Sequence, residues 1–137
     1  MNKTGINRRK LLASIPAMCI LTICNSALMA GMQHDRELKT LAGMLVHQLE
    51  NRRSACVVGR EYLCSAIDEA HLGRLIQLIL GDPEGQALAD LGLDHYAYYA
   101  YLEHRYKSDF TNGRVVEVGG WILSVTEARV CALATTL

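Results

Sequence analysis

The chain has 137 residues and lacks the short motifs that identify most small enzymes and cofactor-binding proteins. It contains no Cys-x-x-Cys pair, no His-Glu-x-x-His, no Gly-x-Ser-x-Gly and no glycine-rich phosphate-binding loop. Thioredoxin-like, zinc-hydrolase, serine-hydrolase and nucleotide-binding chemistry are therefore unsupported. No two of its histidines have the four-residue spacing of a helical zinc pair; they are His34, His47, His71, His95 and His104. We expect no catalytic residues, no cofactor and no metal site.

An excess of basic residues is also missing. The whole chain balances 14 Lys and Arg against 14 Asp and Glu. From Gly31 onward ten basic residues stand against fourteen acidic ones, a net charge of −4. This balance argues against a phosphate-binding face, and hence against a nucleic-acid partner. The body of the chain also has no uniformly apolar run of about 18 residues, which argues against a polytopic membrane protein.

The first 30 residues have the pattern of an export signal. The only charges before Asp35 are basic and lie close to the start, at Lys3, Arg8, Arg9 and Lys10. A largely apolar run, residues 11–24, and then small residues follow them. A positive start, an apolar centre and a small-residue end are typical of a signal peptide. We therefore expect residues 1–30 to be the signal and residues 31–137 to be one helical domain.

The arginine pair in this segment points to a particular export route. Arg8 and Arg9, followed by Leu11 and Leu12, resemble the bacterial twin-arginine (Tat) signal. The resemblance implies the Tat translocase as a partner and a periplasmic location, with the general Sec route as the alternative. If the signal is not cleaved, Leu11 to Gln33 gives 23 residues without a charge. At about 1.5 Å per residue that stretch could form a single N-terminal inner-membrane anchor, with the domain facing the periplasm.

The rest of the chain predicts a mainly α fold, a small bundle of four to five helices with one β-hairpin. Apolar residues recur at helical spacing over about 36–50, 54–66 and 68–80, and again within 83–110. Asp35 is the expected N-cap of the first of these helices, and Ser65 with Asp68 forms a partial capping pattern for the third. Gly81, Asp82 and Pro83 mark the end of that third helix.

The hairpin is predicted over about 115–123. Two β-prone runs flank Gly119 and Gly120, and both glycines can adopt the positive φ that a tight turn requires. Ser124 and Glu127 then form a capping box that opens the last helix. An isolated hairpin is marginally stable, so we expect Trp121 to anchor it against the helices.

Export also bears on the cysteines. Removal of the signal leaves Cys56, Cys64 and Cys131, and an oxidising compartment favours a disulfide. On one helix Cys56 and Cys64 are separated by about 12 Å along the axis, which exceeds disulfide reach. Any bond should therefore join Cys131 to Cys56 or to Cys64. The alternative is three free thiols packed as small apolar residues.

Tyrosine is concentrated in one segment, with five within eleven residues: Tyr96, Tyr98, Tyr99, Tyr101 and Tyr106. A helical stripe through His95, Tyr99, Leu102, Tyr106 and Phe110 is expected in the core. Tyr98 and Tyr101 then form a displaced pair that we expect to be at least partly exposed. With Tyr96 they make a candidate interaction surface, because tyrosine is enriched in interfaces.

The C-terminal residues suggest a family. The pattern Trp121-x-Leu123-Ser124-x-Thr126-Glu127-x-Arg129, preceded by Asp109-Phe110-x-x-Gly113-Arg114, resembles the tail of small, largely uncharacterised bacterial Tat-signal proteins. The layout also resembles the small Tat-signal subunits of membrane-bound flavin dehydrogenases. These resemblances imply an exported, non-catalytic accessory or interaction protein, such as the small subunit or escort of a periplasmic oxidoreductase, with a protein partner or a homo-oligomer. The alternative is a stand-alone exported redox or cofactor-binding protein with a Cys/His site.

Overall fold

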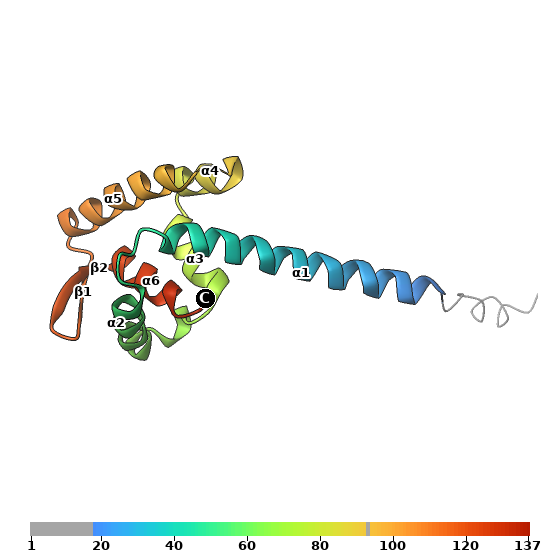
Figure 1. Cartoon of the computed structure of the whole chain (residues 1–137), viewed down its shortest axis with the longest axis horizontal. Helices are drawn as coiled ribbons and strands as arrows, with labels where there is room; N and C mark the ends of the chain where they lie inside the picture. The colour runs from blue at the N-terminus through green and yellow to red at the C-terminus, as the bar shows by residue number, and fades with distance from the viewer. Residues whose placement is uncertain (1–17, 93) are drawn as a thin grey trace, which may run out of the picture. The chain divides into compact units, whose positions relative to one another are not determined.

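The computed structural model describes residues 18–92 and 94–137, and it confirms a mainly helical fold with one hairpin before the last helix (Figure 1). The described part has six α-helices, against the four to five expected. The elements are α1 (Met18–Val46), α2 (Arg52–Ser65), a 3-10 turn η2 (Ile67–Glu69), α3 (Leu72–Leu80), α4 (Pro83–Leu91), α5 (His95–Thr111), β1 (Val115–Val118), β2 (Trp121–Ser124) and α6 (Val125–Ala134).

Contacts divide the chain into two units, Met1–Asp35 and Arg36–Leu137. The division falls inside α1, which is continuous through Asp35, so the prediction that Asp35 caps a helix is wrong. The signal residues Arg8, Arg9, Leu11 and Leu12 lie outside the described residues. Among the helices of the described part, none combines the length and the apolar character needed to span a bilayer.

The core of the second unit is built around α6. This helix packs against α2, α3, α5 and both strands, as Figure 1 shows. Most of its own side chains are small or apolar and are buried, and a helix that is apolar on nearly every side is stable only when it is enclosed. Its buried residues are Thr126, Ala128, Val130, Cys131, Ala132, Leu133 and Ala134. The short segment at the end of the chain therefore organises the whole unit.

Side-chain caps begin four of the helices. Asn51, Asp82, Asp94 and Ser124 each accept a hydrogen bond from the backbone N–H three residues later, which satisfies a donor that the helix leaves unpaired. The expected cap at Ser124 is thus confirmed. The expected capping pattern at Ser65 and Asp68 is wrong, because η2 occupies this stretch and α3 starts later, without a side-chain cap.

The hairpin is confirmed in position and turn type. β1 and β2 pair antiparallel, with Val118 opposite Trp121 and Val116 opposite Leu123. Gly119 and Gly120 form the turn with φ values of 57° and 80°, in the left-handed region that glycine enters without steric cost. Val116, Val118, Trp121 and Leu123 therefore share one face of the hairpin, because cross-strand partners point to the same side.

Candidate functional site

The expected tyrosine surface on α5 is mostly buried. Tyr98 is 0% exposed and Tyr101 is 3% exposed, so the prediction that this pair lies at the surface is wrong. The Tyr98 hydroxyl donates to the carbonyl of Leu88 in α4, and the Tyr101 hydroxyl donates to the carbonyl of Ile79 in α3. α3 and α4 thus pack over Tyr98 and Tyr101, on the side of α5 that was predicted to be exposed. Of the three residues proposed for the surface, only Tyr96 is exposed, at 78%.

The helical stripe that was expected in the core is instead mostly exposed. His95, Tyr99 and Phe110 are exposed, whereas Leu102 is buried and Tyr106 is partly buried. Aromatic side chains occur around the whole circumference of α5, so helical periodicity alone does not identify the buried face.

An acidic residue makes a further contact with Tyr101. Asp82 caps α4 and also accepts a hydrogen bond of 3.1 Å from the Tyr101 hydroxyl. The Arg105 guanidinium pairs with the same carboxylate at 2.6 Å. Burial is the main cause of the raised pKa of Tyr101, so its hydroxyl stays protonated and remains a donor. This cluster is structural and ties α4 to α5.

The residues that carry the family resemblance also have structural roles. Asp109 is buried at the C-terminal end of α5, and its carboxylate accepts a hydrogen bond of 2.9 Å from the backbone N–H of Thr126. Its other oxygen pairs with Arg114 at 2.7 Å. Asp109 therefore joins the end of α5 to the start of α6 across the hairpin. The sequence did not predict this role, because the pattern Asp109-Phe110-x-x-Gly113-Arg114 does not indicate a contact between Asp109 and Thr126.

Arg129 makes a second such link. Its guanidinium donates to both oxygens of Glu69, at 2.7 and 2.9 Å, and the Tyr62 hydroxyl donates to the same carboxylate at 2.7 Å. The hydrogen bond from Arg129 holds the pKa of Glu69 below its ordinary value of 4.5. The contact joins α6 to η2 and α2. Arg129 and Glu69 are far apart in the sequence, and no local pattern connects them.

The three cysteines of the body are free thiols in the structure. Cys131 is buried, and burial raises its pKa to about 11, so the thiol is protonated and unreactive at neutral pH. Cys56 donates from Sγ to the carbonyl of Ala134, one turn from Cys131. Cys64 is exposed and lies about two turns further along α2 than Cys56. If a bond forms during export, this placement favours Cys56 over Cys64 as the partner of Cys131.

One opening in the described part of the chain is an apolar recess, which we call the hairpin recess. It lies between α2, β2 and α6 and has a volume of about 440 Å³. Its walls are Ser54, Ala55, Val58, Trp121, Leu123, Glu127 and Cys131. Glu127 is the only ionisable group in this set besides the buried thiol. The recess can therefore take an apolar side chain, with space for a basic group beside Glu127.

Trp121 forms one wall of the hairpin recess instead of filling it. It shares a hairpin face with Val118 and Leu123, which are buried and partly buried, yet 70% of Trp121 is exposed. The prediction that Trp121 anchors the hairpin in the core is therefore wrong. Its position next to the turn carries its ring beyond the edge of the helices, and Val118 and Leu123 supply the contact instead.

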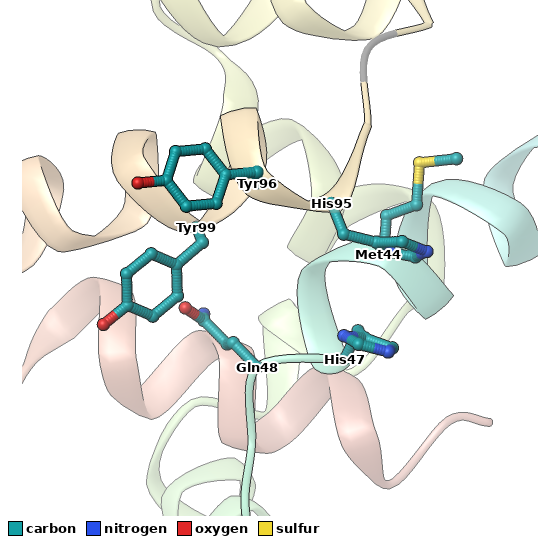
Figure 2. A pocket seen from close by; sticks show the side chains of 6 residues that line it. All are labelled: Met44, His47, Gln48, His95, Tyr96 and Tyr99. Carbon is teal, nitrogen blue, oxygen red and sulfur yellow. The ribbon is translucent and has the colours of Figure 1, made fainter.

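A second, smaller opening lies where α1 ends and α5 begins. Its volume is about 280 Å³, and Figure 2 shows the six side chains around it: Met44, His47, Gln48, His95, Tyr96 and Tyr99. The rings of His47 and His95 stack there, with centroids 4.3 Å apart and planes inclined by 25°. Within the described ranges, no cluster of three or more His, Cys, Asp or Glu side chains is arranged to hold a metal ion.

The comparisons with known proteins add no relative. No family model matches the chain, and no curated protein or solved structure gives a match.

Proposed function

We propose that this chain is an exported, non-catalytic accessory protein that binds a protein partner through the hairpin recess. The observation that carries the proposal is the exposed Trp121 ring at the edge of an apolar recess. Tryptophan contributes more binding energy than most side chains when a partner covers it, and it is enriched at interface hot spots. While Trp121 is exposed to water, its apolar surface contributes no hydrophobic stabilisation. A partner that covered the ring would gain that free energy.

A second exposed apolar side chain lies next to Trp121 in the hairpin. Ile122 is exposed on the other face of the hairpin, opposite Glu117, and Val115 is exposed on that face at the end away from the turn. Each face of the hairpin therefore presents one exposed apolar side chain close to the turn, Trp121 on one face and Ile122 on the other.

Charge favours a different protein over a second copy of this chain. The body carries a net charge of −4, and Glu127 lines the recess itself. A second copy would bring a like-charged surface to this site, whereas a segment with an apolar side chain and a neighbouring Lys or Arg would match it. We therefore propose a partner with such a segment, and the layout of the chain suggests a periplasmic oxidoreductase.

The contact is tested by capture from the periplasm with the full chain as bait, followed by mass spectrometry and binding measurements on the recovered protein. Trp121→Ala should weaken binding about thirtyfold, since a buried hot-spot side chain contributes about 2 kcal/mol or more. Glu127→Lys should also weaken it, because it reverses the charge in the recess. Tyr96→Ala is the matched control, since it removes another exposed aromatic ring that lies outside the recess.

Two results would contradict the proposal. One is equal binding by the wild-type chain and Trp121→Ala, with both folded. The other is a dimer of the wild-type chain that Trp121→Ala dissociates, which would assign the recess to a second copy. Because Trp121 is 70% exposed, its replacement should change the melting temperature by only a few degrees, so that lost binding is not lost folding.

The export part of the proposal is tested separately. Replacing Arg8 and Arg9 with Lys should leave the precursor in the cytoplasm, because the Tat signal that they resemble requires the arginine pair. Normal export of the double variant would indicate the Sec route.

A further inference from the structure

One edge of the hairpin has backbone groups without a partner. Val118 and Trp121 flank the two-residue turn, and a turn of that length is closed by a hydrogen-bonded pair. Such pairs alternate along the hairpin with pairs whose backbone groups point outward. The hydrogen bond of 3.1 Å from the Val125 N–H to the Arg114 carbonyl has the phase that this alternation requires. The N–H and carbonyl of Ile122 therefore point away from β1, and no group in the described part of the chain bonds to them.

This edge of β2 borders the hairpin recess. α2 packs against β1, whereas on the β2 side the recess lies between the strand, at Trp121 and Leu123, and the first half of α2, at Ser54 and Val58. A segment that pairs with the Ile122 backbone therefore runs along the recess. Successive side chains of a strand point to opposite faces, so every second side chain of that segment lies on the same face as Trp121, over the recess.

Carboxylates lie at both ends of this stretch. Glu127 lines the recess at the end where β2 meets α6. At the other end the Glu61 carboxylate lies next to the turn, since a Cβ built on Gly119 would be 2.9 Å from its Oε2. Within the described residues neither glutamate forms an ion pair, and no Lys or Arg lines the recess. The four residues of β2 between these ends span about 13 Å.

We propose that the partner adds an extended segment to β2 as a third, antiparallel strand, and that this segment has the pattern basic-x-apolar-x-basic. The inference rests on the proposed contact at the hairpin recess and specifies how that contact is made. Backbone hydrogen bonds to Ile122 hold the segment in register, and antiparallel pairing is the more stable arrangement per residue. The central apolar side chain fills the recess beside Trp121. The two basic side chains, which share its face because they are two residues away on either side, meet Glu61 and Glu127.

A synthetic peptide, acetyl-Thr-Lys-Val-Leu-Val-Lys-Thr-amide, tests this pairing with the full chain. Its lysines and its leucine share one face when it is extended, as the pattern requires. Trp121 is the single tryptophan of the chain and is 70% exposed, so its fluorescence should shift to shorter wavelength as the peptide covers the ring. We expect saturable binding that Glu61→Gln and Glu127→Gln each weaken about threefold, since exposed ion pairs contribute modestly.

N-methylation of the peptide separates strand pairing from a contact through side chains alone. In the proposed register the N–H groups of the valines point toward β2, whereas that of the leucine points away. Methylating both valine nitrogens should therefore weaken binding about fivefold or more, as the loss of one hydrogen bond implies. Methylating the leucine nitrogen is the matched control and should leave binding unchanged. On the protein, Ile122→Pro removes the donor and should also weaken binding, while Ile122→Val keeps the donor and should not.

The proposal is wrong if the valine-methylated and leucine-methylated peptides bind alike, or if the unmethylated peptide does not bind at millimolar concentration. Equal binding of the two methylated peptides that Trp121→Ala abolishes would refute the third strand and leave the recess as a contact through side chains. Capture of the partner with Trp121→Ala tests the recess itself, so the two proposals fail separately. If circular dichroism shows that Ile122→Pro does not fold, the methylated peptides decide the question on the wild-type chain.

Discussion

Gly59 in α2 is the position at which the packing is most sensitive to one added methyl group. A Cβ built on Gly59 would overlap the carbonyl oxygen of Cys131 and lie 2.7 Å from the Cα of Ala132. These are backbone atoms of α6, the helix at the centre of the core, so no side-chain rotation relieves the overlap. Gly59→Ala therefore requires α2 and α6 to separate.

Two effects of opposite sign decide the size of the change. Alanine is favoured over glycine inside a helix by about 1 kcal/mol. Overpacking of a tight core contact costs about 1–3 kcal/mol and occasionally more, and here the contact is backbone to backbone along the most extensive helix pair in the structure. Because no side chain can move to relieve the overlap, we expect the overpacking cost to be at or above the top of that range, which leaves a net loss of about 2 kcal/mol or more. For a domain of about 100 residues that lowers the melting temperature by about 8–16 °C.

Thermal melts followed by circular dichroism measure this difference. Gly43→Ala in α1 is the matched control, because a Cβ at Gly43 meets no atom within 4 Å. It should raise the stability of the folded chain by up to about 1 kcal/mol, the helix-propensity gain alone. If Gly59→Ala melts at or above the wild-type temperature, the close approach of α2 to α6 is refuted.

Two further predictions concern the ion pair and the thiols. Arg129 holds the pKa of Glu69 below 4.5. The ion pair therefore stabilises the fold above pH 4.5, and this stabilisation is lost as the pH falls through the lowered pKa. Glu69→Gln should therefore narrow the difference between the melting temperatures at about pH 7 and about pH 3.5. In chain recovered from the periplasm, any disulfide found by peptide mass spectrometry should join Cys56 to Cys131 and leave Cys64 alkylatable; a Cys64–Cys131 bond would contradict the packing of α2 on α6.

Much of the secondary structure could be predicted from the sequence because its signals are local. Gly119 and Gly120 favour a tight turn between two β-prone runs, and the Ser124 hydroxyl accepts a hydrogen bond from the backbone N–H of Glu127, which caps the last helix. Such signals act over three or four residues, and the structure confirms the hairpin and the last helix at these positions. The start of α3 was misplaced because the short η2 turn has no equally specific pattern.

The exposure of individual side chains was decided by tertiary packing. Tyr98 and Tyr101 are buried because α3 and α4 cover their side of α5, and a helix with aromatic residues all round does not indicate that side in advance. Trp121 faces the body of the unit but extends past the helices that would cover it.

The candidate sites depend on tertiary structure for the same reason. The hairpin recess exists because α2, β2 and α6 leave a space beside Trp121, and His47 meets His95 only when the end of α1 lies beside the start of α5. Local sequence determines where a helix or turn begins, since its hydrogen bonds span a few residues. Which faces remain open depends on contacts between residues far apart in the chain, and these form only when the whole core assembles.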